Sequence, residues 1–231
     1  MVPTHWGKVF GRSKAMVNGV AAAQRFPWLA SLRLALAGSG SALVLVEGAA
    51  GMGKTHVLGE LSVLSEAAEA HRALWRCGAA EELPDMATGP VLLLVDDVHR
   101  ATPQEKAWLR GVAEKPRPGL VAILAHRPEE LETAGLPLGT PAVSYPPGLS
   151  IFRHRLHVWD AERVRRAAAD ALGDRATDEA AERLYARSGG VPQVVVDLLG
   201  APRAGTRPKC TASDVDAAGV PVRLGTDTEP S

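Results

Sequence analysis

The sequence predicts an α/β fold in which a parallel β-sheet with flanking helices is followed by a small C-terminal helical lid. Three runs of strand length contain only apolar residues, which is typical of parallel strands buried on both faces; they are residues 42–46, 91–95 and 120–125. Helical patterns separate these runs, and strands that alternate with helices favour a parallel sheet. After Asp160 the pattern is helical only, which predicts a separate helical unit.

Local signals predict the elements between the three runs. Apolar residues recur at helical spacing after the first run and predict a helix over residues 54–70. Residues 73–77 predict a second strand, and a last strand is predicted near residues 154–158, after a loop rich in Pro and Gly over 128–149. Thr102, Pro103 and Glu105 have the spacing of a capping box with proline at the first helical position, so we expect a helix from there to Glu114.

The predicted lid contains three helices. Asp160 is a candidate N-cap for the first helix, the second begins at Thr177 and ends at Gly189 and Gly190, and the third begins near Pro192. Beyond Gly200 the periodicity disappears, which predicts weak order. The expected division of the chain is a lead-in over residues 1–40, a core over 41–159, a helical lid over 160–200 and a tail over 201–231.

The residues after the first apolar run have the pattern of a phosphate-binding loop. Glycines let backbone N–H groups surround an anion, and the helix that follows adds partial positive charge at its N-terminus. Lys54 would reach the β- and γ-phosphates, and Thr55 would ligate Mg²⁺. The spacing therefore predicts a P-loop NTPase core with these nucleotide-binding residues: Gly48, Ala49, Ala50, Gly51, Met52, Gly53, Lys54, Thr55 and His56.

Acidic and basic residues follow the other two apolar runs. Asp96 is the candidate Mg²⁺ ligand together with Thr55, and Asp97 is the candidate that polarises the attacking water. Arg127 is a candidate sensor of the γ-phosphate, and its catalytic role would be to stabilise transition-state charge. His99 is a candidate neighbour of the γ-phosphate. The alternatives are an Asp-Asp turn that closes a strand, a surface arginine and a solvated loop histidine.

Composition narrows the functional classes. The 231 residues include 26 basic and 26 acidic side chains, so net charge gives no reason to expect broad attraction to nucleic acid or to an anionic membrane. Cys77 and Cys210 have no metal-ligand spacing, which favours reduced thiols in a cytoplasmic protein. We expect no signal peptide and no membrane span, because the N-terminal segment lacks a long apolar run.

Three segments resemble motifs of AAA/STAND-type ATPases, and in particular the ATPase module of large ATP-binding LuxR-type regulators; they are residues 46–55, 93–99 and 125–131. Residues 187–192 resemble the lid motif of these regulators, in which a Gly-x-Pro turn brings Pro192 towards the adenine. Phe10, Gly11 and Arg12 resemble a Gly-Arg element near the base. The resemblance implies an ASCE-type fold, in which a strand with a polar sensor lies between the glycine-loop strand and the acidic strand.

The resemblance also implies a molecular switch that binds ATP and Mg²⁺, hydrolyses ATP slowly and returns to an ADP-bound form. The regulators continue into a sensor region and a DNA-binding domain, which we do not find after Gly200, and the span from Thr55 to Asp96 is short for the family. Direct DNA binding is therefore not expected, whereas a protein partner or self-association is. Two alternatives stay open: a non-catalytic nucleotide-binding module that acts by protein contact, and a small-molecule kinase.

Overall fold

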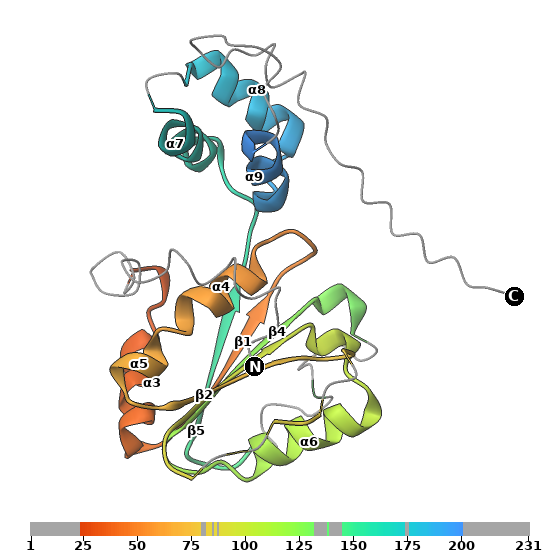
Figure 1. Ribbon diagram of the computed structural model, residues 1–231. Helices are drawn as coiled ribbons and strands as arrows, with labels where there is room; N and C mark the ends of the chain where they lie inside the picture. Colours follow the sequence, from red (N-terminus) through yellow and green to blue (C-terminus); the bar gives the residue numbers. More distant parts are fainter. Residues whose placement is uncertain are drawn as a thin grey trace, which may run out of the picture. The chain divides into compact units, whose positions relative to one another are not determined.

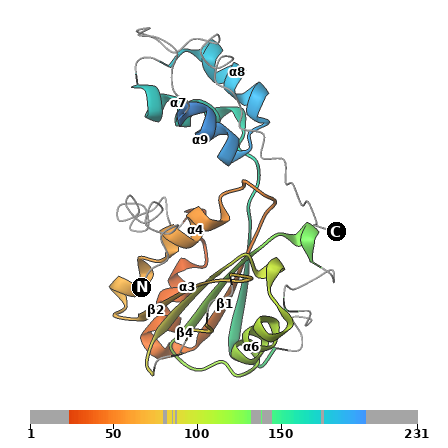
Figure 2. The same ribbon diagram turned by 45° about the vertical axis from the view of Figure 1, so that its right-hand side comes forward.

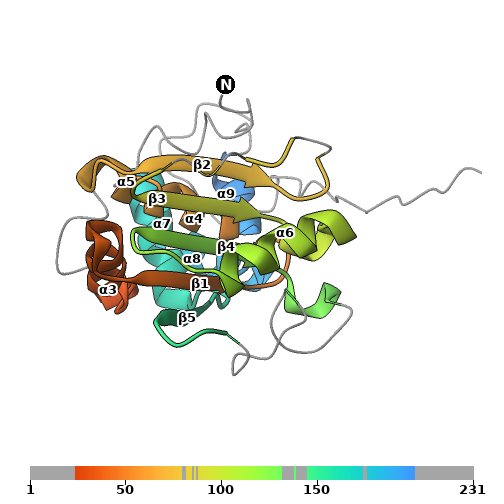
Figure 3. The same ribbon diagram turned by 90° about the horizontal axis from the view of Figure 1, so that it is seen from below.

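The computed structural model describes residues 24–79, 82–84, 86, 88–131, 138, 145–173 and 176–200. Within these residues, parallel strands form a five-stranded sheet with the order β2-β3-β4-β1-β5 (Figure 3). The strands are β1 (Ser41–Glu47), β2 (His71–Arg76), β3 (Val91–Asp96), β4 (Leu120–His126) and β5 (Leu149–Arg155). Because β4 lies between β1 and β3, the arrangement is the predicted ASCE type, and the predicted fold class is confirmed.

Helices cover both faces of this sheet (Figure 2). The helices α3 (Leu29–Leu34), α4 (Lys54–Leu61) and α5 (Leu64–Ala67) pack on one face, and α6 (Pro103–Glu114) packs on the other. Alternate residues of each strand enter the two cores, so that Val44 contacts the α3 and α4 side and Leu45 the α6 side. This double burial explains why β1, β3 and β4 are apolar along most of their length.

The chain divides into two compact units, Met1–Leu156 and His157–Ser231. In the second unit, α7 (Ala161–Leu172), α8 (Asp178–Ser188) and α9 (Pro192–Gly200) share a core that includes Val164, Leu184 and Val195 (Figure 1). The predicted N-caps are confirmed, because Asp160 Oδ1 accepts a bond from Arg163 N at 2.7 Å and Thr177 Oγ1 accepts one from Ala180 N at 3.1 Å. The predicted domain boundaries stay a prediction.

The predicted capping box of α6 is also confirmed. Thr102 Oγ1 accepts from Glu105 N at 3.3 Å, and Glu105 Oε2 accepts from Thr102 N at 2.6 Å. The buried carboxylate of Glu105 also accepts a bond from Gly78 N, which follows β2. The N-terminus of α6 is therefore attached to the neighbouring strand end.

The predicted helix over residues 54–70 is wrong in its length. It is broken into α4 and α5 at Ser62 and Val63. Ser62 Oγ donates to Gly59 O at 2.7 Å, and Ser65 Oγ donates to Ser62 O at 2.8 Å. Serine hydroxyls that bond to nearby backbone carbonyls compete with regular helical hydrogen bonds. Apolar periodicity alone did not reveal this competition.

Two predicted strands are displaced. The second strand begins at His71 rather than Ala73, and Cys77 lies in the turn after it. The last strand is Leu149–Arg155 rather than 154–158, and it pairs with β1 from Ser41 opposite Leu149 to Glu47 opposite Arg155. As an edge strand, β5 has alternating exposure and charged residues, so the apolar signal that marks a central strand is missing.

Some of the sequence-based predictions concern residues that the structure does not describe. Arg12, Cys210 and the 201–231 tail lie outside the described residues. Cys77 is buried, and this burial raises the pKa of its thiol to about 12. Among the described residues, no helix combines the length and the apolar character needed to cross a bilayer.

Candidate functional site

The glycine loop connects β1 to α4 at the carboxyl end of the sheet. Gly51 and Gly53 have φ values of +74° and +90°, a region that side chains rarely adopt. A Cβ on Gly48 would lie 3.1 Å from Leu156 Cβ and 3.2 Å from Met52 Cβ. The glycines are therefore needed for the path of the loop, and Gly53 places the first residue of α4 directly after it.

Lys54 extends back over the loop from the first position of α4. Its Nζ donates to Gly48 O at 2.6 Å and to Ala49 O at 2.9 Å, and the residue is 7% exposed. Burial, assisted by the nearby charge of Arg127, lowers the pKa of Lys54. A buried ammonium group with neutral acceptors gains from an incoming anion, which is the property that a phosphate-binding lysine requires.

Thr55 and Asp96 come together as the sequence predicted. Thr55 Oγ1 donates to Asp96 Oδ2 at 2.6 Å, joining α4 to the end of β3. Asp96 is 3% exposed, and burial raises its pKa, although the bond from Thr55 opposes this rise. A hydroxyl and a carboxylate oxygen in contact are ligand types suited to Mg²⁺.

Asp97 is held by a residue that the sequence reasoning missed. Its Oδ2 accepts from Arg76 Nε at 2.8 Å and lies 2.7 Å from Arg76 Nη2. Arg76 ends β2, the strand beside β3, and its Cα is paired with that of Asp96. Asp97 also has a φ of +53°, so the backbone turns sharply here. The sequence feature that could have revealed Arg76 is a basic residue near the end of the predicted strand over residues 73–77.

Arg127 and His99 meet at a second unpredicted residue, Glu130, in the short helix η3 (Pro128–Glu130). Arg127 Nη1 donates to Glu130 Oε1. His99 Nε2 lies 3.2 Å from Glu130 Oε2 and 3.8 Å from Asp97 Oδ1. The His99 side chain is only 1% exposed, so the alternative of a solvated loop histidine is wrong. Burial lowers the pKa of His99, which favours the neutral imidazole.

Two other predicted nucleotide-binding residues, His56 and Pro192, have their described contacts away from the glycine loop. His56 Nε2 lies 3.4 Å from Glu60 Oε1, which also accepts from Arg25 Nη1 at 2.6 Å. This contact joins α4 to the segment before α3 and gives His56 a structural partner. Pro192 begins α9 in the second compact unit and is buried there. Its approach to a nucleotide stays a prediction.

Glu47 and His126 form a buried polar pair beneath the loop. They face each other in the register of β1 and β4, and Gly48 N donates to His126 O at 3.3 Å. Glu47 lies 3.6 Å from Arg153 Nε and 3.4 Å from Arg155 Nη2. His126 is fully buried, and its ring nitrogens have no hydrogen-bond partner among the described residues. The sequence feature that could have revealed Glu47 and His126 is a polar residue directly after each apolar run.

His126 makes the stability of the chain sensitive to acid. Burial lowers the pKa of His126 to about 4, whereas a histidine in an unfolded chain titrates near 6.5. Between these values the unfolded state binds the proton more readily, so we expect the free energy of unfolding to fall as the pH drops from 6.5 to 4. The expected contribution is about 3 kcal/mol. Urea denaturation at several pH values measures it.

The control for this pH dependence is His71→Gln, at an exposed position of β2. His126→Gln should remove about 3 kcal/mol of the acid-dependent loss, whereas His71→Gln should leave the loss close to that of the wild type. Equal pH dependence in all three proteins would contradict the role of His126.

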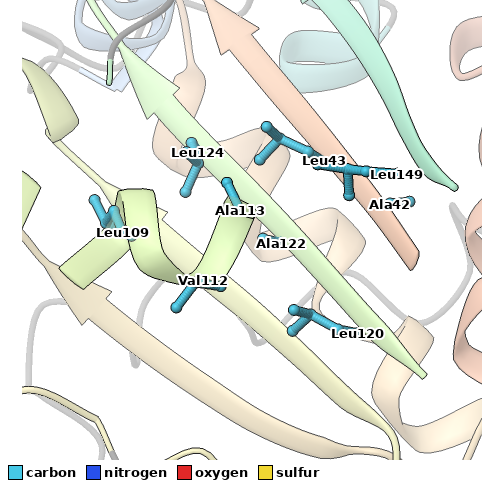
Figure 4. A pocket seen from close by; sticks show the side chains of 9 residues that line it. All are labelled: Ala42, Leu43, Leu109, Val112, Ala113, Leu120, Ala122, Leu124 and Leu149. Atoms are coloured by element: carbon cyan, nitrogen blue, oxygen red, sulfur yellow. The ribbon is translucent and has the colours of Figure 1, made fainter. Parts of the chain in front are cut away.

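A small pocket beneath α6 does not provide an alternative ligand site (Figure 4). Its volume is about 10 Å³, and side chains such as Leu43, Leu109, Val112 and Leu124 line it. A space of this size is close to the minimum for one water molecule, and the side chains that line it are apolar. It is a packing gap between helix and sheet.

Solved structures show the same fold. A point mutant of RuvB from Thermotoga maritima matches with 18% identity and a TM-score of 0.55, covering 76% of this chain and 60% of that one. A second RuvB mutant matches with 16% identity and a TM-score of 0.54, covering 76% and 59%. The RuvB Holliday junction branch migration motor matches with 19% identity and a TM-score of 0.51, covering 74% and 58%.

The chain has the P-loop NTPase fold of these RuvB structures. At these identities the likeness concerns the fold alone, and the chain spans about 60% of the RuvB structures. No family model matches the sequence, and no curated protein shows significant similarity. The likeness to LuxR-type regulators therefore stays a hypothesis.

The P-loop residues fit a nucleotide and Mg²⁺. The loop is free of side chains where Gly51 and Gly53 turn, and Lys54 lies over it. Thr55 and Asp96 supply oxygen ligands, but no group of three or more His, Cys, Asp or Glu side chains forms a metal site in the described part of the chain. Mg²⁺ would therefore need phosphate oxygens and water to complete its coordination.

Proposed function

We propose that this chain binds ATP with Mg²⁺ at Gly48–Thr55 and hydrolyses it slowly as a regulatory switch. The observation that carries the proposal is the contact between Thr55 and Asp96 at 2.6 Å, beside a buried Lys54 that lies over the glycine loop. These groups come from α4 and β3, and they supply the cation and the oxygen ligands that a bound nucleotide requires.

Each residue has a distinct proposed role. Lys54 binds the β- and γ-phosphates, Thr55 and Asp96 hold the metal, and Asp97 orients the attacking water. Arg127 stabilises charge on the γ-phosphate in the transition state. Bound ATP supplies the phosphoanhydride bond, and Mg²⁺ offsets the charge of its phosphates. In the structure Arg76 contacts only Oδ2 of Asp97, so Oδ1 is the oxygen proposed to accept a hydrogen bond from the attacking water.

Calorimetric titration of the full chain with ATP and ADP, with Mg²⁺ and with EDTA, tests the proposal. We expect Mg²⁺-dependent binding of both nucleotides and phosphate release that needs no added acceptor. Absence of binding to either nucleotide would overturn the proposal. Phosphate release only in the presence of a small-molecule acceptor would favour the kinase alternative.

A non-catalytic nucleotide-binding module is the second candidate, and the paired state of Asp97 favours it. The variant Asp97→Asn separates the two functions. If Asp97 activates water, the variant should lose about 100-fold or more in turnover and keep its nucleotide affinity, because general-base catalysis contributes factors of this size. Unchanged residual turnover in Asp97→Asn would support the non-catalytic module.

We also propose a cytoplasmic protein that acts through a protein partner or through self-association. The resemblance to regulatory ATPases supports this part of the proposal. RuvB is a branch migration motor, but the shared fold gives no reason to propose the same activity for this chain. Net charge likewise gives no support for direct DNA binding.

A further inference from the structure

Glu130 connects two residues at the carboxyl end of the sheet. Its Oε1 accepts from Arg127 Nη1, and its Oε2 lies 3.2 Å from the buried His99 Nε2. The backbone supports this arrangement, because Pro128 begins η3 and Glu130 N donates to Arg127 O at 3.2 Å. One carboxylate oxygen of Glu130 is therefore bonded to Arg127, and the other faces the buried imidazole of His99.

Lys54 and Arg127, the two cations assigned here to the phosphates, already have protein acceptors. Lys54 Nζ donates to loop carbonyls, and Arg127 Nη1 donates to Glu130. A γ-phosphate that uses Arg127 must compete with the Glu130 carboxylate. ADP has no γ-phosphate, so its binding leaves the Arg127–Glu130 pair intact.

We propose that Glu130 sets the preference of this site between ATP and ADP by occupying Arg127 until a γ-phosphate replaces it. This inference rests on the proposed nucleotide-binding function. Glu130 acts here as a positioning residue, since it reaches the nucleotide only through Arg127. Its second oxygen lies 3.2 Å from Nε2 of the buried His99 without a hydrogen bond to it, and His99 in turn lies near Asp97.

Two further observations support competition at Arg127. Arg127 Nε is buried and has no hydrogen-bond partner among the described residues, so the guanidinium group has a donor that Glu130 does not use. Glu130 has a lowered pKa, chiefly because of its hydrogen bond from Arg127, and remains ionised at neutral pH. The ion pair is partly exposed, with side-chain exposures of 32% and 43%, so ligand exchange requires no unfolding.

Calorimetry with Mg²⁺ and either ADP or a non-hydrolysable ATP analogue tests the inference. Glu130→Gln should increase the preference for the triphosphate about fivefold, the upper range for a partly exposed ion pair. Glu129→Gln is the matched control, because it removes the same charge from the adjacent position of η3. The charge of Glu129 acts on Lys54, whereas Glu130 is bonded directly to Arg127, so the control should change the preference less than Glu130→Gln does. Glu130→Asp, with a shorter side chain, should shift the preference in the same direction as Glu130→Gln.

The decisive comparison is made in an Arg127→Ala background. There Glu130→Gln should have no effect on the preference, because no guanidinium remains to compete for. An equal effect with and without Arg127, or an equal effect of Glu129→Gln, would overturn the inference. If the wild type binds both nucleotides and Glu130→Gln leaves their ratio unchanged, only this inference fails; if the wild type binds neither, the proposed function fails as well.

Discussion

Lys54→Ala should reduce the affinity for Mg²⁺–ATP by about 30-fold to several thousandfold, since removing one partner of a buried, hydrogen-bonded charge pair typically costs about 2–5 kcal/mol. Lys54 Nζ lies over the loop, 2.6 Å from Gly48 O, and its buried charge has only neutral acceptors there. Phosphate oxygens would replace these carbonyls as acceptors. Calorimetric titration with ATP measures the loss.

The matched control is Lys115→Ala, which removes an exposed lysine at the end of α6. Its nucleotide affinity should equal that of the wild type within about twofold, because exposed charges at a distance are screened by salt. Circular dichroism should show that both variants keep the helix and strand content of the wild type. Wild-type affinity in Lys54→Ala would place any nucleotide site elsewhere.

Gly190→Ala should destabilise the second compact unit by about 3 kcal/mol or more, from a left-handed backbone and a steric clash combined. Gly190 has a φ of +73°, and a Cβ there would lie 2.1 Å from Trp159 O. The two backbones are held together by the bond from Trp159 N to Gly190 O at 2.7 Å. An added methyl group therefore cannot be accommodated without breaking this contact.

The neighbouring glycine provides the control for this prediction. Gly189 has a φ of +57°, but a Cβ there would meet no atom within 4 Å. Gly189→Ala should therefore cost only about 1–2 kcal/mol, the backbone penalty alone. Chemical denaturation followed by helical circular dichroism compares the two variants. Equal destabilisation would show that the approach of Trp159 does not determine the need for glycine at position 190.

This contact gives part of the Gly-x-Pro motif a structural explanation. The sequence resemblance assigns the turn at Gly190, Val191 and Pro192 to the neighbourhood of the adenine. Within its own unit, Gly190 allows the segment at Trp159 to pass close to the turn between α8 and α9. The proposed role of Pro192 in base binding is a separate question, which nucleotide titration of Pro192 variants would address.

Most of the fold could be predicted from local patterns. Apolar runs indicate β1, β3 and β4 because central parallel strands are buried on both faces, and capping residues fix the starts of α6, α7 and α8 because they bond to the first turn of their own helix. The displaced edge strand β5 has neither signal. Its bounds depend on pairing with β1, more than 100 positions away in the sequence.

The candidate site likewise has one part that local sequence spacing predicts and another that depends on the tertiary structure. The spacing of Gly48–Thr55 and the acidic residues after β3 were sufficient to predict that Thr55 and Asp96 serve the same Mg²⁺, and in the structure the two side chains are in contact. The neighbours of Asp97 and His99 were not predicted, because they depend on which strand ends lie side by side and where each side chain points. Arg76 reaches Asp97 only because β2 lies beside β3, and Glu130 reaches His99 only because η3 turns back after β4.

The sequence by itself therefore determined the strand, loop and helix order of a P-loop and the residue types that could hold phosphate and metal, since these are local properties of the chain. Only the tertiary structure decided which charges neutralise one another and which are buried. Ion pairs and burial depend on distances between segments that are remote in sequence. For this protein those distances bring Arg76 to Asp97 and place the buried His99 beside Glu130.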